Sequence, residues 1–154
     1  MKNNNSIYEV TPPSLFLNDN GPSILALGFK QETVRGILSA IFDKMFPDSS
    51  ITYYYNPHST NESTIAWARA VVNMVDQIVI NADTANELEV FLAVSSLYQY
   101  NENIDITWIA EDYSNKGLCK LVNSYNQKIF TSWDHFNQVV EDTLNGLQTT
   151  IFYV

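Results

Sequence analysis

The sequence alternates short apolar runs with longer segments whose apolar residues recur at helical spacing. The runs have the length and composition of buried strands, and they cover residues 23–29, 51–55, 77–82, 104–110 and 128–130. The segments between and after them predict helices, and these cover residues 31–46, 62–75, 84–98, 115–125 and 132–145. Pro47 ends the first helix and Gly146 the last.

Strands that alternate with helices predict βαβ units and a mostly parallel sheet. Right-handed crossovers then favour an α/β fold, a three-layer α/β/α sandwich whose roughly five strands follow a flavodoxin-like order. We expect one α/β domain over residues 23–147. An N-terminal extension, residues 1–22, offers residues 15–17 as a candidate edge strand. The apolar tail, residues 148–154, either packs back on the domain or mediates association.

The composition narrows the function classes. The formal net charge is −9 and the eight Lys and Arg are scattered, so we expect no nucleic-acid partner. One cysteine excludes an intrachain disulfide, and two distant histidines disfavour a metal site. No apolar run reaches the length of a membrane span or a signal peptide. We therefore expect no membrane association and a cytoplasmic location, which is the host cytoplasm if the protein is viral. The glycine-poor loops carry no nucleotide-cofactor fingerprint, and no cofactor is expected.

Residues 76–93 combine a buried strand, a polar turn and a helix start. This order places Glu87 in the first turn of a helix at the carboxyl end of a strand, where open α/β sheets bind ligands. An ionised carboxylate at that position can act as a nucleophile on a sugar carbon. The same pattern also fits a capping box in which Asp83 or Thr84 caps the helix and Glu87 completes it. Glu89 lies on another face of the helix and is expected to be solvated.

The same residues resemble a segment of the nucleoside 2-deoxyribosyltransferase-like superfamily, which includes small deoxynucleotide N-glycosidases. The family segment has the form D-x-v-v-a, then a loop, then G-T-x-x-E-l-G with an alanine soon after. The matching residues are Asp76, Ile78, Val79, Ile80, Thr84, Glu87, Leu88 and Ala93. The resemblance implies that Glu87 attacks C1′ of a nucleoside or nucleotide and that Asp83 or Asn81 lies near a sugar hydroxyl. Asp83 and Glu89 replace two glycines of the family pattern.

Further candidates lie at the same predicted edge. Gly28 and Phe29 follow the first strand, Thr84 follows the third, and all three are candidate ligand contacts. Tyr55 ends the second strand and would stack on a base or belong to the core. His58 follows it and would donate a proton to a leaving base or have no role.

Three functions therefore remain open. The first is an N-glycosidase or deoxyribosyltransferase, and the second is a degenerate, non-catalytic nucleotide-binding protein. The third is a protein-interaction module of the kind found among small viral accessory proteins. Self-association is a further expectation, which the resemblance supports.

Overall fold

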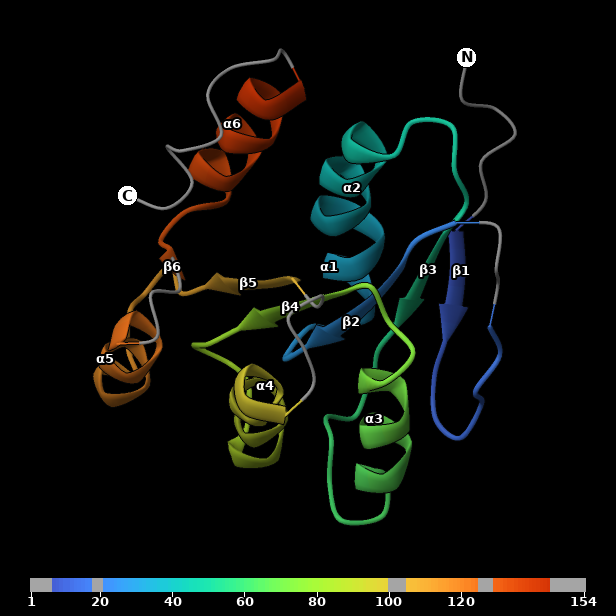
Figure 1. The fold of residues 1–154 in the computed structure, drawn as a ribbon, viewed down its shortest axis with the longest axis vertical. Coiled ribbons are helices and arrows are strands. Elements are labelled where there is room, and N and C mark those ends of the chain that lie inside the picture. Colours follow the sequence, from blue (N-terminus) through green and yellow to red (C-terminus); the bar gives the residue numbers. More distant parts are fainter. Residues whose placement is uncertain (1–6, 18–20, 100–104, 125–128, 145–154) are drawn as a thin grey trace.

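The computed structural model describes residues 7–17, 21–99, 105–124 and 129–144. Within this part of the chain, six strands form one parallel sheet in the order β1-β3-β2-β4-β5-β6 (Figure 1). The strands are β1 (Ile7–Val10), β2 (Ser23–Leu27), β3 (Ile51–Tyr54), β4 (Gln77–Asn81), β5 (Asp105–Ile109) and β6 (Ile129–Phe130).

Helices cover both faces of this sheet. They are α1 (Gln31–Thr33), the π-helical turn η1 (Val34–Leu38), α2 (Ser39–Met45), α3 (Ile65–Val72), α4 (Glu87–Gln99), α5 (Lys116–Ser124) and α6 (Trp133–Leu144). The run from α1 to α2 lies with α6 on one face, and α3, α4 and α5 lie on the other (Figure 1). The predicted three-layer, flavodoxin-like α/β/α sandwich is confirmed, with six strands where about five were expected.

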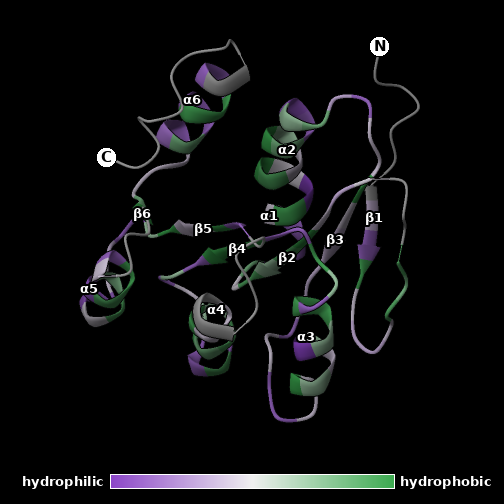
Figure 2. Ribbon diagram, viewed as in Figure 1, coloured by the Kyte–Doolittle hydropathy of each residue, from purple (hydrophilic) through white to green (hydrophobic). Residues whose placement is uncertain are grey.

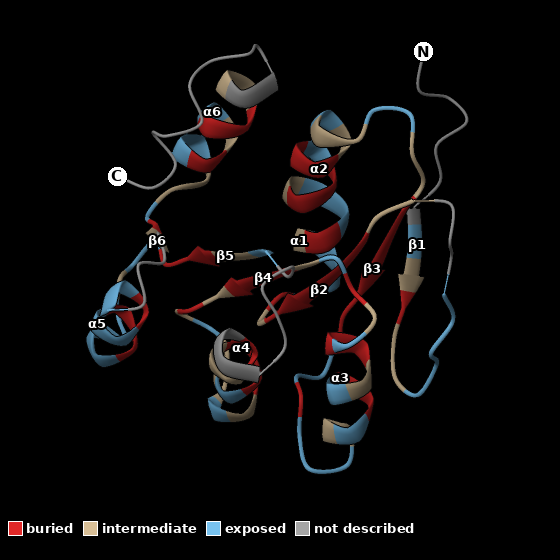
Figure 3. Ribbon diagram, in the orientation of Figure 1, coloured by how far each residue is buried: buried red, intermediate tan, exposed pale blue. Residues whose placement is uncertain are grey.

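The core has two halves because successive residues of each strand face opposite sides of the sheet. Tyr54 packs in the cluster beneath α3 and α4, whereas Tyr53 and Tyr55 pack in the cluster beneath α2 and α6. The three tyrosines therefore alternate between the two faces, as successive residues of a strand do. Every residue of β2 and β3 is buried (Figure 3), and hydrophobic residues of the helices, coloured green in Figure 2, join them in the core. Interior parallel strands are covered on both faces, which is why they read as continuous apolar runs.

The N-terminal extension supplies an edge strand, but at a different place from the one expected. β1 pairs with β3, with Ile7 opposite Ile51, and residues 15–17 form no strand. Their segment bonds side chains from elsewhere in the fold. Trp67 Nε1 donates to the carbonyl of Ser14 at 2.5 Å, and Tyr54 Oη donates to that of Phe16 at 2.6 Å. The apolar tail, residues 148–154, and the end of the last predicted helix at residue 145 lie outside the described residues.

The first predicted helix is continuous but contains a π-helical turn. The Ser39 hydroxyl, buried beneath it, donates to Val34 O at 2.8 Å. Of the described groups, none gives the buried Tyr53 Oη a hydrogen bond, and burial raises its pKa. The helix ends at Met45, one residue earlier than predicted, because a residue before proline is pushed out of the helical region.

Candidate functional site at the carboxyl edge of the sheet

The strand order places a topological switch point between β2 and β4. From β2 the chain passes to β3 on one side, then crosses to β4 on the other. In open parallel sheets the crevice outside such neighbouring strands is the usual ligand site. Gly28, Asn81, Asp83 and Thr84, all of which the sequence singled out, lie at this point.

At the switch point, the loop after β4 packs against Gly28. Its φ of +80° lies in the left-handed region, where a side chain is strained. A Cβ on Gly28 would lie 3.0 Å from both the Cα and N of Ala85, and 3.1 Å from Asn81 O. Thr84 Oγ1 also donates to Gly28 O at 2.7 Å. The loop after β4 therefore packs directly on the end of β2.

A capping box completes this closure, two residues later than the predicted one. Asn86 N donates to Glu89 Oε1 at 2.9 Å, and Glu89 N donates back to Asn86 Oδ1 at 3.0 Å. The other oxygen, Glu89 Oε2, accepts from Gly28 N at 3.3 Å. Glu89 is only 3% exposed, so the expectation that it is solvated is wrong. The helix begins at Glu87 because Asn86 caps it, while Thr84 bonds to Gly28, the residue after β2.

Glu87 lies in the first turn of α4, as predicted, and its side chain is exposed. Among the described residues its carboxylate makes no hydrogen bond or ion pair. The cap residue before it, Asn86, donates through Nδ2 to Thr60 O at 2.7 Å. That contact joins the start of α4 to the loop that carries the exposed His58. The structure thus brings together the segments of the two catalytic candidates.

Asn81 and Asp83 organise loops. Asn81 Oδ1 accepts a hydrogen bond from Asp83 N at 3.0 Å, which forms an Asx turn. The Asp83 carboxylate accepts from Asp112 N at 2.9 Å, from Ser114 N at 3.1 Å and from Ser114 Oγ at 3.0 Å. Asp83 therefore holds the loop after β5 against the loop after β4. Its carboxylate is occupied by these contacts in the structure.

The two aromatic candidates are packed inside the protein. Phe29 is buried, with its ring centroid 6.0 Å from that of Trp133. Tyr55 is also buried, and its hydroxyl donates to Glu9 Oε1 at 2.5 Å. Stacking of either ring on a base would require the core to open locally.

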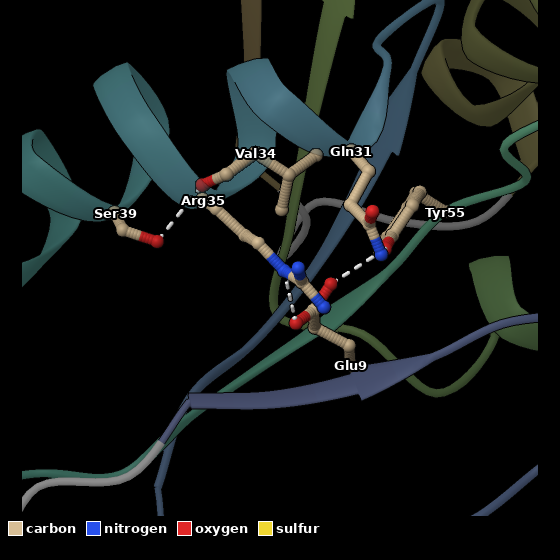
Figure 4. A network of polar contacts seen from close by, with 6 residues as sticks. All are labelled: Glu9, Gln31, Val34, Arg35, Ser39 and Tyr55. Atoms are coloured by element: carbon tan, nitrogen blue, oxygen red, sulfur yellow. Dashed lines mark hydrogen bonds and ion pairs between the residues drawn. The ribbon is translucent and has the colours of Figure 1, made fainter.

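Tyr55 belongs to a polar network that the sequence did not reveal (Figure 4). Gln31 Nε2 donates to Tyr55 Oη at 3.1 Å, and Arg35 Nε donates to Glu9 Oε2 at 2.7 Å. Burial alone would raise the pKa of Glu9. The hydrogen bonds from Tyr55 and Arg35, with the Arg35 charge, outweigh burial and lower that pKa. Burial and the bond to Glu9 raise the pKa of Tyr55. The network fastens the edge strand β1 to the helix above it.

Comparisons with known proteins add no assignment. No protein-family model matches the chain, and no curated protein is significantly similar to it. Within the described ranges, no helix combines the length and apolar character needed to cross a bilayer. In the same residues, no three His, Cys, Asp or Glu side chains gather in a way that would hold a metal ion. The geometry of the carboxyl edge is therefore the basis for a functional proposal.

Proposed function

We propose that this protein is a binding module that acts through protein contacts rather than an N-glycosidase. The observation that carries the proposal is the closure of the switch point on Gly28. Thr84 Oγ1 donates a hydrogen bond to the carbonyl of Gly28, and Glu89 Oε2 accepts one from its amide. The backbone of Ala85 fills the space beside Gly28. A sugar at this position would have to displace all three contacts.

An exposed apolar loop supports protein contact. Leu15, Phe16 and Leu17 are each about half exposed, with Phe16 the most exposed of the three at 51%. The carbonyls of Ser14 and Phe16 accept hydrogen bonds from Trp67 and Tyr54. These bonds fix the backbone of the loop while its apolar side chains remain exposed. Contiguous exposed apolar side chains mark interaction sites in globular proteins.

A site-specific photo-crosslinker tests this proposal. We would place benzoyl-phenylalanine at position 16 and, as a matched control, at position 91, because Phe91 is 61% exposed on α4. After irradiation in cells, we expect protein adducts at position 16 and none at position 91. Absence of adducts at position 16, or equal adducts at both positions, would contradict the proposal.

One observation favours a second function, N-glycosidic bond cleavage. Glu87 is an exposed carboxylate at the carboxyl edge, and the loop of His58 is fastened beside it. In this reaction a Glu87 oxygen bonds to C1′ while the bond from C1′ to the base breaks. His58 gives the leaving base its proton, and water then hydrolyses the glycosyl ester.

Base release distinguishes the two functions. Deoxynucleosides and deoxynucleotides are incubated with the protein, and free base is measured by chromatography. The glycosidase function predicts release that disappears in Glu87→Gln but survives in Glu62→Gln, a change at another exposed carboxylate. The interaction module predicts no release from any substrate. Release that depends on Glu87 would overturn our first proposal.

A further inference from the structure

The outer edge of β1 and the apolar loop beside it form one surface, here called the edge patch. It consists of the β1 backbone with Tyr8, Leu15, Phe16 and Leu17. The rings of Tyr8 and Phe16 lie 5.9 Å apart, and all four side chains are exposed. β1 is the last strand on its side of the sheet, so no described strand pairs with its outer edge (Figure 1).

The direction of the free hydrogen-bonding groups follows from the pairing with β3. Tyr55 N donates to Val10 O at 3.2 Å, so the backbone groups of Val10 point toward β3. Alternate residues of a strand share a direction, which places those of Tyr8 on the same side. The N–H and C=O groups of Ile7 and Glu9 therefore point outward. No described backbone group bonds them on that side. An exposed strand edge of this kind is a template for another strand.

We infer that the edge patch binds the edge patch of a second copy, with the two β1 strands antiparallel. This inference rests on the proposed interaction function and names its partner. Directly opposed residues of an antiparallel pair lie on the same face of the sheet. Only a register with Tyr8 opposite Tyr8 of the second copy pairs Ile7 with Glu9 in both directions. That register uses all four outward groups and brings the two Tyr8–Phe16 clusters together.

The local charge of the edge patch is compatible with a second copy, and its described residues give a basic partner no free carboxylate to bind. The chain carries a net charge of −9, yet Glu9 is the sole charged side chain among the described residues of the edge patch. Arg35 neutralises it through their ion pair of 2.7 Å. The alternative register, with Glu9 opposite Glu9, would place like charges directly across the strands, which is unfavourable. A self-complementary patch is what a two-fold dimer requires.

The first test is the molar mass of the full chain, measured by light scattering over about a hundredfold range of concentration. We expect twice the chain mass of 17.5 kDa at the upper end. Ile7→Pro removes one outward N–H at the first strand position, where proline is tolerated. Phe16→Glu places two charges in the apolar contact. Each variant should weaken the dimer at least about tenfold, whereas Phe91→Glu should not. A monomer at every concentration, or a dimer lost only in Phe91→Glu, would overturn the inference.

A disulfide tests the register itself. Opposed residues of a pair without hydrogen bonds have Cα atoms about 4.5 Å apart, within disulfide reach. Tyr8→Cys should therefore give a covalent dimer under mild oxidation, and Phe91→Cys should not. No covalent dimer from Tyr8→Cys, or equal amounts from both variants, refutes the register. A monomeric chain whose position 16 still crosslinks to another protein refutes the second copy but leaves the interaction function standing.

Discussion

Replacement of Gly28 by alanine tests the closure of the switch point most sharply. The left-handed backbone of Gly28 costs a non-glycine residue about 1–2 kcal/mol. The added Cβ would also meet backbone atoms of Ala85 at 3.0 Å and Asn81 O at 3.1 Å, which cannot rotate away. Overpacking of this kind costs about 1–3 kcal/mol. We therefore expect Gly28→Ala to lower the free energy of unfolding by about 2–5 kcal/mol.

Gly36→Ala is the matched control with the opposite sign. Gly36 is exposed in the π-helical turn, and a Cβ there meets nothing within 4 Å. Alanine should stabilise the protein by about 0.5–1 kcal/mol, because it loses less backbone entropy on folding. Thermal unfolding should show a fall in Tm of about 4–20 °C for Gly28→Ala and a rise of about 1–4 °C for Gly36→Ala. Equal effects from both substitutions, or a neutral Gly28→Ala, would refute the reasoning.

Three further predictions follow from the polar contacts. Glu89→Gln should lower the free energy of unfolding, measured by urea denaturation, by about 2–4 kcal/mol, because an amide replaces a carboxylate that accepts from two backbone N–H groups. Glu87→Gln should change it by no more than about 0.5 kcal/mol. Similar losses in both variants would contradict the capping assignment. Tyr55→Phe should lower the free energy of unfolding by about 1–3 kcal/mol, because it removes a hydrogen-bond donor to ionised Glu9. Tyr53→Phe should leave it unchanged or raise it by up to about 1 kcal/mol, because the hydroxyl that it removes is buried without a hydrogen bond from any described group. The native fold lowers the pKa of Glu9, so its contribution is present above the ordinary value of 4.5 and lost as pH falls through the lowered value. Glu9→Gln should therefore flatten stability against pH below 4.5, as measured by urea denaturation, and an unchanged slope would refute this.

The order of strands and helices was predictable because interior parallel strands read as apolar runs. The edge strand was placed wrongly because residues 15–17 are apolar but belong to a loop. Their segment bonds the side chains of Tyr54 and Trp67, which lie far away in the sequence. Ile7–Val10, with a glutamate in a strand of four residues, gives a much weaker strand signal.

The sequence predicted which loops meet at the carboxyl edge of the sheet, but not the contacts between them. Gly28 and residues 81–84 do meet at the switch point, because strand ends of a parallel sheet share one edge. The capping pair was shifted because Thr84 bonds to Gly28 O, and only tertiary structure reveals that bond. The spacing from Asn86 to Glu89 was a local signal for the true cap. The network of Glu9, Arg35 and Tyr55 has no local signal, since its members come from separate elements.

Amide hydrogen exchange at Gly28 tests the closed switch point most directly. If Glu89 accepts a hydrogen bond from this amide and the loop after β4 covers it, the amide should exchange as slowly as those of Ile78 and Ile80 in the buried strand β4. Added deoxynucleosides should leave that rate and the Gly28 chemical shift unchanged. Fast exchange at Gly28, or a shift change on addition of a nucleoside, would contradict the closed crevice.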